Sequence, residues 1–90
     1  MARYLIEIPH KAEKLECMQA KTILLTTGSH FLTNADWGCL DGEHKAWFFM
    51  EAENKEEVVR IIPPAYRDHS KIVKLSKYNL NDPDGLVDVH

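Results

Sequence analysis

The dipeptide Asp41-Gly42 constrains the fold of this chain more than any other feature. It lies between two runs of strand-forming residues, 30–40 and 43–52. Asp-Gly between two such runs is among the strongest local signals for a β-hairpin, because both residues tolerate the backbone angles of a tight turn. The sequence therefore predicts an antiparallel pair of strands in the middle of the chain.

Further elements are predicted on both sides of this hairpin. Gly28 suits the left-handed cap at the end of a helix, and Asn54 with Glu57 resembles a capping box at the start of another. Pro63-Pro64 then stops that second helix. The predicted elements are a strand at 4–8, a helix over 11–27, a short helix over 54–62 and a fourth strand over 71–78.

This order of elements predicts an α+β domain of ferredoxin-like βαββαβ type. Such a domain has a four-stranded antiparallel sheet in the order 4-1-3-2, with two helices on one face and the other face bare. We expect one domain over residues 1–78 and a loosely held tail over 79–90. Ninety residues are enough for one hydrophobic core and too few for two.

Composition and charge make nucleic acid and membranes unexpected as binding partners. The net charge is −3, with acids and bases mixed along the chain, so no extended positive field is available for nucleic acid or a membrane surface. The apolar runs are too short to cross a bilayer, and no signal peptide is recognisable. We expect a cytoplasmic protein in which Cys17 and Cys39 stay reduced.

The register of the hairpin predicts the two faces of the sheet. With a two-residue turn, Trp37 lies opposite Ala46, and cross-strand partners share a face. The helices then cover the face of Trp37, and Trp47 lies on the bare one. The large apolar residues expected on the bare face are Leu5, Leu32, Trp47 and Phe49. Two such sheets packed face to face would bury this patch, so we expect a homodimer.

The order of elements is accompanied by a resemblance in sequence. The opening Arg-Tyr-Leu-Ile-Glu at 3–7 and the segment Ser-His-Phe-Leu-Thr-Asn-Ala-Asp-Trp-Gly-Cys-Leu-Asp-Gly-Glu-His-Lys-Ala-Trp at 29–47 resemble small bacterial dimeric α/β-barrel proteins, most of which are uncharacterised. The resemblance reaches to about Tyr78 and implies dimerisation sheet to sheet. The superfamily includes cofactor-free monooxygenases, haem-degrading enzymes, lactone isomerases and a ferredoxin-like nickel-binding group. No catalytic signature of these branches is matched residue by residue.

Cys39 and His44 form one candidate metal site. The predicted turn places them opposite each other, and thiolate with imidazole suits nickel, zinc or copper. The candidate metal ligands are His30, Asp36, Cys39 and His44. Alternation along the strand turns Asp36 to the other face, and a buried cysteine is commonly a small hydrophobe, so a structural role stays open.

Three histidines form another candidate cluster. His10, His30 and His69 flank strands that are expected to meet at one end of the sheet. His10 and His69 belong to neighbouring strands, whereas His30 belongs to the far edge strand. Solvated surface histidines are the alternative interpretation.

A third candidate site lies on the bare face of the sheet. Acid–base or metal-ligating groups in an apolar cavity can acquire shifted pKa values and a defined role. The candidate ligand-binding residues are Glu7, His30, Asn34, Asp36, Trp47 and Phe49. They can equally be interface polar groups that satisfy one another.

The sequence leaves three functions open. The first is a homodimeric binding protein that holds a divalent metal ion or a small ligand between its sheets. The second is a cofactor-free isomerase or monooxygenase-like enzyme that uses the same cavity, and the third is a structural or regulatory dimer.

Overall fold

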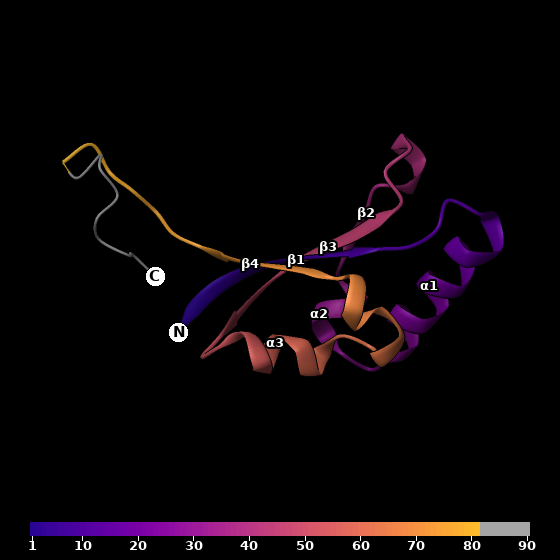
Figure 1. The fold of residues 1–90 in the computed structure, drawn as a ribbon, viewed down its shortest axis with the longest axis horizontal. Coiled ribbons are helices and arrows are strands. Elements are labelled where there is room, and N and C mark those ends of the chain that lie inside the picture. The colour runs from indigo at the N-terminus through magenta and orange to yellow at the C-terminus, as the bar shows by residue number, and fades with distance from the viewer. Residues whose placement is uncertain (82–90) are drawn as a thin grey trace.

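The computed structural model describes residues 1–81, which form a four-stranded sheet with helices (Figure 1). The last nine residues of the predicted tail lie outside the described residues. The elements in chain order are β1 (Ala2–Pro9), α1 (Lys14–Thr26), α2 (His30–Thr33), β2 (Asp36–Trp37), η1 (Cys39–Asp41), β3 (Lys45–Ala52), α3 (Lys55–Ile61), η2 (Pro64–His69) and β4 (Lys71–Leu75), where η marks a 3₁₀ helix.

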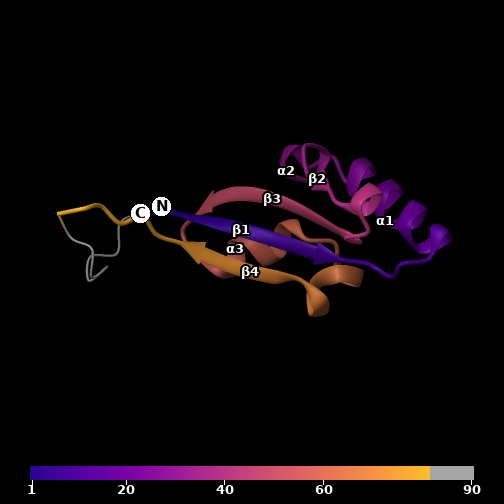
Figure 2. The same ribbon diagram turned by 90° about the horizontal axis from the view of Figure 1, so that it is seen from above.

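The strand order is β2-β3-β1-β4, and every pair of neighbours is antiparallel. This is the predicted 4-1-3-2 order counted from the other edge, so the α+β class and the sheet topology are confirmed. Figure 2 shows β3, β1 and β4 side by side. Trp37 pairs with Ala46 in β3, which is also the predicted register.

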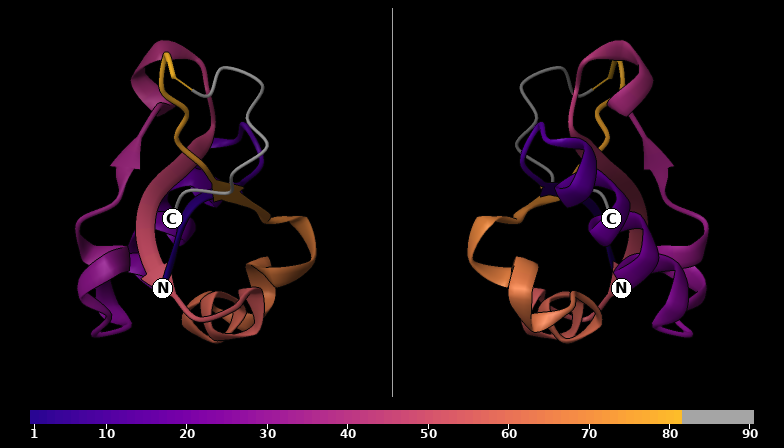
Figure 3. Two further views of the ribbon diagram at one scale, coloured as in Figure 1. Left: turned by 90° about the vertical axis from the view of Figure 1, so that its left-hand side faces the viewer. Right: turned by 90° about the vertical axis from the view of Figure 1, so that its right-hand side faces the viewer.

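The core lies between one face of the sheet and the helices. β1 alternates strictly, with Tyr4, Ile6 and Ile8 buried and the residues between them more exposed, as expected for a strand with one covered face. The helices contribute Leu24 from α1 and Val58 from α3 to the same cluster. Figure 3 looks along the molecule and shows α3 beneath the strands. In the described residues the opposite face of the sheet has no covering layer.

The predicted second strand is mostly wrong. Residues 30–33 form the short helix α2, and only Asp36–Trp37 pair with β3. Leu32 was expected on the bare face, but α2 turns it into the core, where it is completely buried. Burial of this one side chain favours a helical turn over continuation of the edge strand.

The turn of the hairpin is longer than the predicted two residues. The amide of Glu43 donates to the carbonyl of Gly38 at 3.0 Å, and the amide of Gly38 donates to the carbonyl of Lys45 at 3.1 Å. The segment between them contains η1, and Gly42 follows it with φ of 82°. The register of the strands is kept because the extra residues are accommodated within this loop.

The helix boundaries follow the predicted signals. α1 ends before Gly28, which has φ of 82° as expected for a left-handed cap. Asn54 accepts a hydrogen bond from the amide of Glu57 at 3.0 Å and begins α3. No helix within residues 1–81 combines the length and the apolar character needed to cross a membrane.

Candidate metal centre

Four metal-ligating side chains meet at the end of the sheet where β1 stops and β3 starts. His10 follows β1, and His44 precedes β3. Because β1 and β3 are antiparallel neighbours, the end of β1 lies beside the start of β3. The amide of His10 donates to the carbonyl of His44 at 3.0 Å. α1 supplies Cys17 and η1 supplies Cys39. Four separate segments of the chain therefore converge on one point.

The distances in this group fit a tetrahedral metal site. One ligand atom from each of His10, Cys17, Cys39 and His44 can be chosen so that all four lie within 4.8 Å of one another. The Cys17 and Cys39 Sγ atoms are 3.4 Å apart, and Cys39 Sγ is 3.4 Å from His10 Nε2. Typical zinc bond lengths put tetrahedral sulfur ligands about 3.8 Å apart, and a sulfur and a nitrogen about 3.6 Å apart. Small shifts of these side chains would therefore complete zinc coordination.

The surroundings of the group affect its protonation. Burial lowers the pKa of His10, and the charges of His44 and Lys21 lower it further, which favours the neutral imidazole that binds metals. Burial raises the pKa of the Cys39 thiol, and the hydrogen bond with Cys17 raises this pKa further. The positive charge of Lys21 acts in the opposite direction and lowers it. Since a thiol must lose its proton to bind a metal, uptake at this group releases protons.

The two imidazoles are held by aromatic packing. The His10 ring lies 5.8 Å from the Trp37 ring and 5.7 Å from the His44 ring, the latter nearly edge-on at 85°. The Nδ1 atoms of His10 and His44 are buried and have no hydrogen-bond partner in the described structure. A buried ring nitrogen without a partner is costly. Coordination through Nδ1 would satisfy the His44 ring, whereas His10 faces Cys39 Sγ through its other nitrogen, Nε2.

The candidate cluster contains two of the four residues that the sequence suggested as metal ligands. Cys39 and His44 belong to the group, whereas His30 and Asp36 do not. Asp36 is exposed and pairs with Trp47 in the sheet. Among residues 1–81, this is the one cluster of three or more His, Cys, Asp or Glu side chains with metal-site spacing.

His30 and Asn34 interact with each other on α2. The Asn34 side chain donates to the His30 carbonyl at 2.8 Å, and its Nδ2 atom is 3.3 Å from His30 Nδ1. Both residues are exposed. Because residues 30–33 form α2, which packs against α1 and β3, these two residues do not extend a strand beside Trp47 as the sequence predicted.

The bare face does hold Glu7, Trp47 and Phe49, as predicted. The Trp47 indole donates to Glu7 Oε1 at 3.1 Å, and Lys45 Nζ lies 3.7 Å from the same oxygen. Arg3 lies over the Phe49 ring at 4.4 Å from its centre. Glu7 is thus already engaged by two partners, which matches the alternative that these polar groups satisfy one another.

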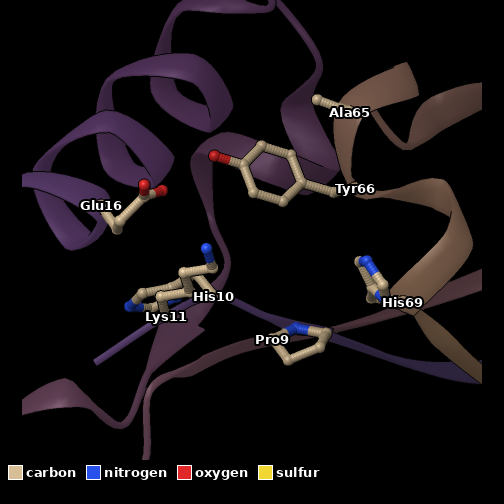
Figure 4. A pocket seen from close by; sticks show the side chains of 7 residues that line it. All are labelled: Pro9, His10, Lys11, Glu16, Ala65, Tyr66 and His69. Atoms are coloured by element: carbon tan, nitrogen blue, oxygen red, sulfur yellow. The ribbon is translucent and has the colours of Figure 1, made fainter. Parts of the chain in front are cut away.

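A pocket of about 490 Å³ lies beside the metal-ligand group and shares His10 with it (Figure 4). His69 lines it too, so these two histidines lie at the same end of the sheet, as predicted. His30 is not part of it, because β2 and β1 run in the same direction and place the start of one strand far from the end of the other. Tyr66 also lines the pocket, and burial and the charge of Glu16 raise the pKa of its phenol.

His10 and Cys17 were not among the candidate metal ligands predicted from the sequence. Their spacing, with six residues between them, is not a recognised zinc motif on its own, and neither is the spacing of Cys39 and His44. The available signal was topological. In the predicted strand order, the residue after the first strand is a neighbour of the residue before the third, which places His10 beside His44.

The chain matches no protein-family model, no curated protein and no solved structure. The fold and the ligand group define a small α+β domain with a candidate Cys₂His₂ metal centre at one end of its sheet.

Proposed function

We propose that this protein binds a metal ion, with zinc as the preferred metal, through His10, Cys17, Cys39 and His44. The observation that carries this proposal is the convergence of two sulfur and two imidazole ligands from four chain segments within 4.8 Å. Two thiolates with two imidazoles in tetrahedral arrangement favour zinc over nickel or oxidised copper, which prefer square-planar or tetragonal sites.

A role as a binding site, and not as a catalytic centre, agrees with this ligand set. Four protein ligands complete a tetrahedral zinc site, whereas catalytic zinc keeps one position open for water or substrate. The two thiolates would also cancel the charge of the ion. The metal would tie β1, α1 and the hairpin loop together, so its binding free energy would add to the stability of the fold.

The test is metal analysis of protein purified without an affinity tag, followed by titration with zinc and with cobalt. We expect about one zinc per chain, a cobalt spectrum typical of tetrahedral sulfur coordination and a higher melting temperature with zinc. Cys39→Ser and His44→Ala should lose all three signals. His30→Ala is the matched control and should keep them. Wild-type protein that takes up no zinc, or a Cys39→Ser variant that binds it normally, would contradict the proposal.

We also propose that a second copy of the chain covers the bare face of the sheet. Phe49 and Val73 are 50% and 37% exposed there, beside the half-buried Trp47. The face carries both signs of charge, with Arg3 directly opposite Glu51. A two-fold dimer brings the same patch together with itself, so a face of mixed sign can be complementary to its own copy. This is the dimer type implied by the sequence resemblance.

A further inference from the structure

The thiols of Cys17 and Cys39 are close enough to react with each other. Both cysteines are free, and their Sγ atoms are 3.4 Å apart. A disulfide bond is about 2.0 Å long, so the two sulfurs would have to approach by about 1.4 Å. The same two atoms are half of the proposed metal ligands.

The surrounding chain allows this approach. Cys39 lies in the hairpin loop, where Leu40, Asp41, Gly42 and Glu43 are all exposed and none belongs to the core. Cys17 lies near the start of α1, after an exposed segment. A small movement of the loop toward α1 would therefore bring the sulfurs together without displacing a core side chain.

We infer that Cys17 and Cys39 form a reversible dithiol–disulfide couple, and that this disulfide and a bound metal ion exclude each other. The second half of the inference rests on the proposed metal binding. A metal needs the thiolate form of cysteine, and both thiolates are consumed when the disulfide forms. Of the four proposed ligands, only the two imidazoles then remain, and two ligands are too few to hold zinc tightly.

Hydrogen peroxide is the oxidant that we name for this step. One thiolate attacks a peroxide oxygen, the O–O bond breaks, and a sulfenic acid and hydroxide form. The other thiolate attacks the sulfenic sulfur, the S–S bond forms, and a second hydroxide leaves. Two thiols and one peroxide thus give one disulfide and two waters, counting the protons released by the thiols. The sulfurs are oxidised, the peroxide is reduced, and the metal ion leaves with its ligands lost.

The experiment is stepwise oxidation of reduced, zinc-loaded protein by hydrogen peroxide. A chromogenic chelator measures the zinc released, and intact mass with peptide mapping measures the bond between Cys17 and Cys39. We expect one zinc released for each intramolecular disulfide formed, and full recovery of zinc binding after reduction with dithiothreitol. A disulfide that forms while zinc stays bound overturns the inference, and so does zinc release with sulfinic acids or intermolecular disulfides as the only products.

Two variants separate this inference from the proposed function. His10→Ala removes a metal ligand but leaves both sulfurs, so it should lose zinc and still form the disulfide; His44→Ala serves the same purpose if His10→Ala does not fold. Cys17→Ser should form no intramolecular disulfide. Wild-type protein that takes up no zinc overturns the proposed function and the exclusion together. A metal-free variant with both cysteines that forms no intramolecular disulfide overturns the couple itself, whatever the wild type binds.

Discussion

Gly38 is the residue on which the geometry of the hairpin loop depends most directly. A Cβ atom placed there would lie 2.8 Å from the Glu43 carbonyl oxygen and 2.8 Å from the Trp47 ring. Both distances are far below van der Waals contact, and one of the obstructing atoms is backbone. The small size of this glycine therefore matters, because its own backbone angles are open to other residues.

We expect Gly38→Ala to weaken zinc binding by about tenfold or more and to destabilise the fold by about 1–3 kcal/mol. The added methyl group must push the loop away from Trp47, and Cys39 moves with the loop. Zinc competition with a calibrated chelator measures the first effect, and urea unfolding of the metal-free protein measures the second.

Gly42→Asn is the matched control for this substitution. Gly42 lies in the same loop with φ of 82°, and nothing lies within 4 Å of an added Cβ. Asparagine tolerates the left-handed conformation, so we expect zinc affinity close to that of the wild type. Equal losses in both variants would show that the loop responds to any substitution and not to the contact at Gly38.

At the scale of elements, the residues that cap the start of α3 stabilise this helix. Asn54 accepts a hydrogen bond from the amide of Glu57, and Glu57 Oε2 accepts one from the amide of Glu53 at 3.2 Å. These contacts supply hydrogen-bond acceptors to backbone amides at the start of α3, which have no acceptor within the helix. Val58 and Ile62 then pack into the core from this helix and the residue after it.

We predict that Asn54→Ala lowers the free energy of unfolding by about 1 kcal/mol. The alanine cannot accept the hydrogen bond from Glu57, so the first turn of α3 loses its cap. Chemical unfolding followed by circular dichroism measures the change. Asn54→Ser keeps a capping oxygen and should unfold close to the wild-type midpoint; a serine variant as unstable as the alanine variant would count against the cap.

The element that the sequence predicted least well is the segment from His30 to Trp37. Its aromatic and β-branched residues are typical of a strand, and a single helical turn of four residues leaves almost no periodic signal of its own. What distinguishes the two is the position of Leu32, which is buried under the sheet in the structure. That burial depends on residues far away in the sequence, namely those of α1 and β3.

At the scale of the whole molecule, the bare sheet face is where a second copy of the chain is expected. We predict that Phe49→Glu converts a dimer into a monomer, because it places a charge in the centre of the proposed interface. Sedimentation velocity over a range of protein concentrations measures the change. Tyr78→Glu is the control, since Tyr78 is 63% exposed but lies beyond the end of β4. A wild-type protein that sediments as a monomer at every concentration would refute the dimer.

The candidate metal centre was predictable only in part. Cys39 and His44 are close in sequence and lie across one turn, so local reasoning found them. His10 and Cys17 come from the end of β1 and from α1, and they reach the site only because the sheet order and the packing of α1 bring them there. His30 and Asp36 were expected on the bare face of the sheet, and their elements place them away from the group.

The sequence by itself determined the class of fold, the strand order, the register of the hairpin and the face on which Trp47 lies. These features follow from alternation, turn residues and helix caps, which act over a few residues and are visible in one dimension. The tertiary structure alone decided that residues 30–33 coil into α2, that Leu32 is buried, and that the four potential metal ligands converge on one point. Those outcomes depend on which apolar surfaces, far apart in the sequence, are buried against each other, and on where each side chain points once they are. Neither can be read from a few neighbouring residues.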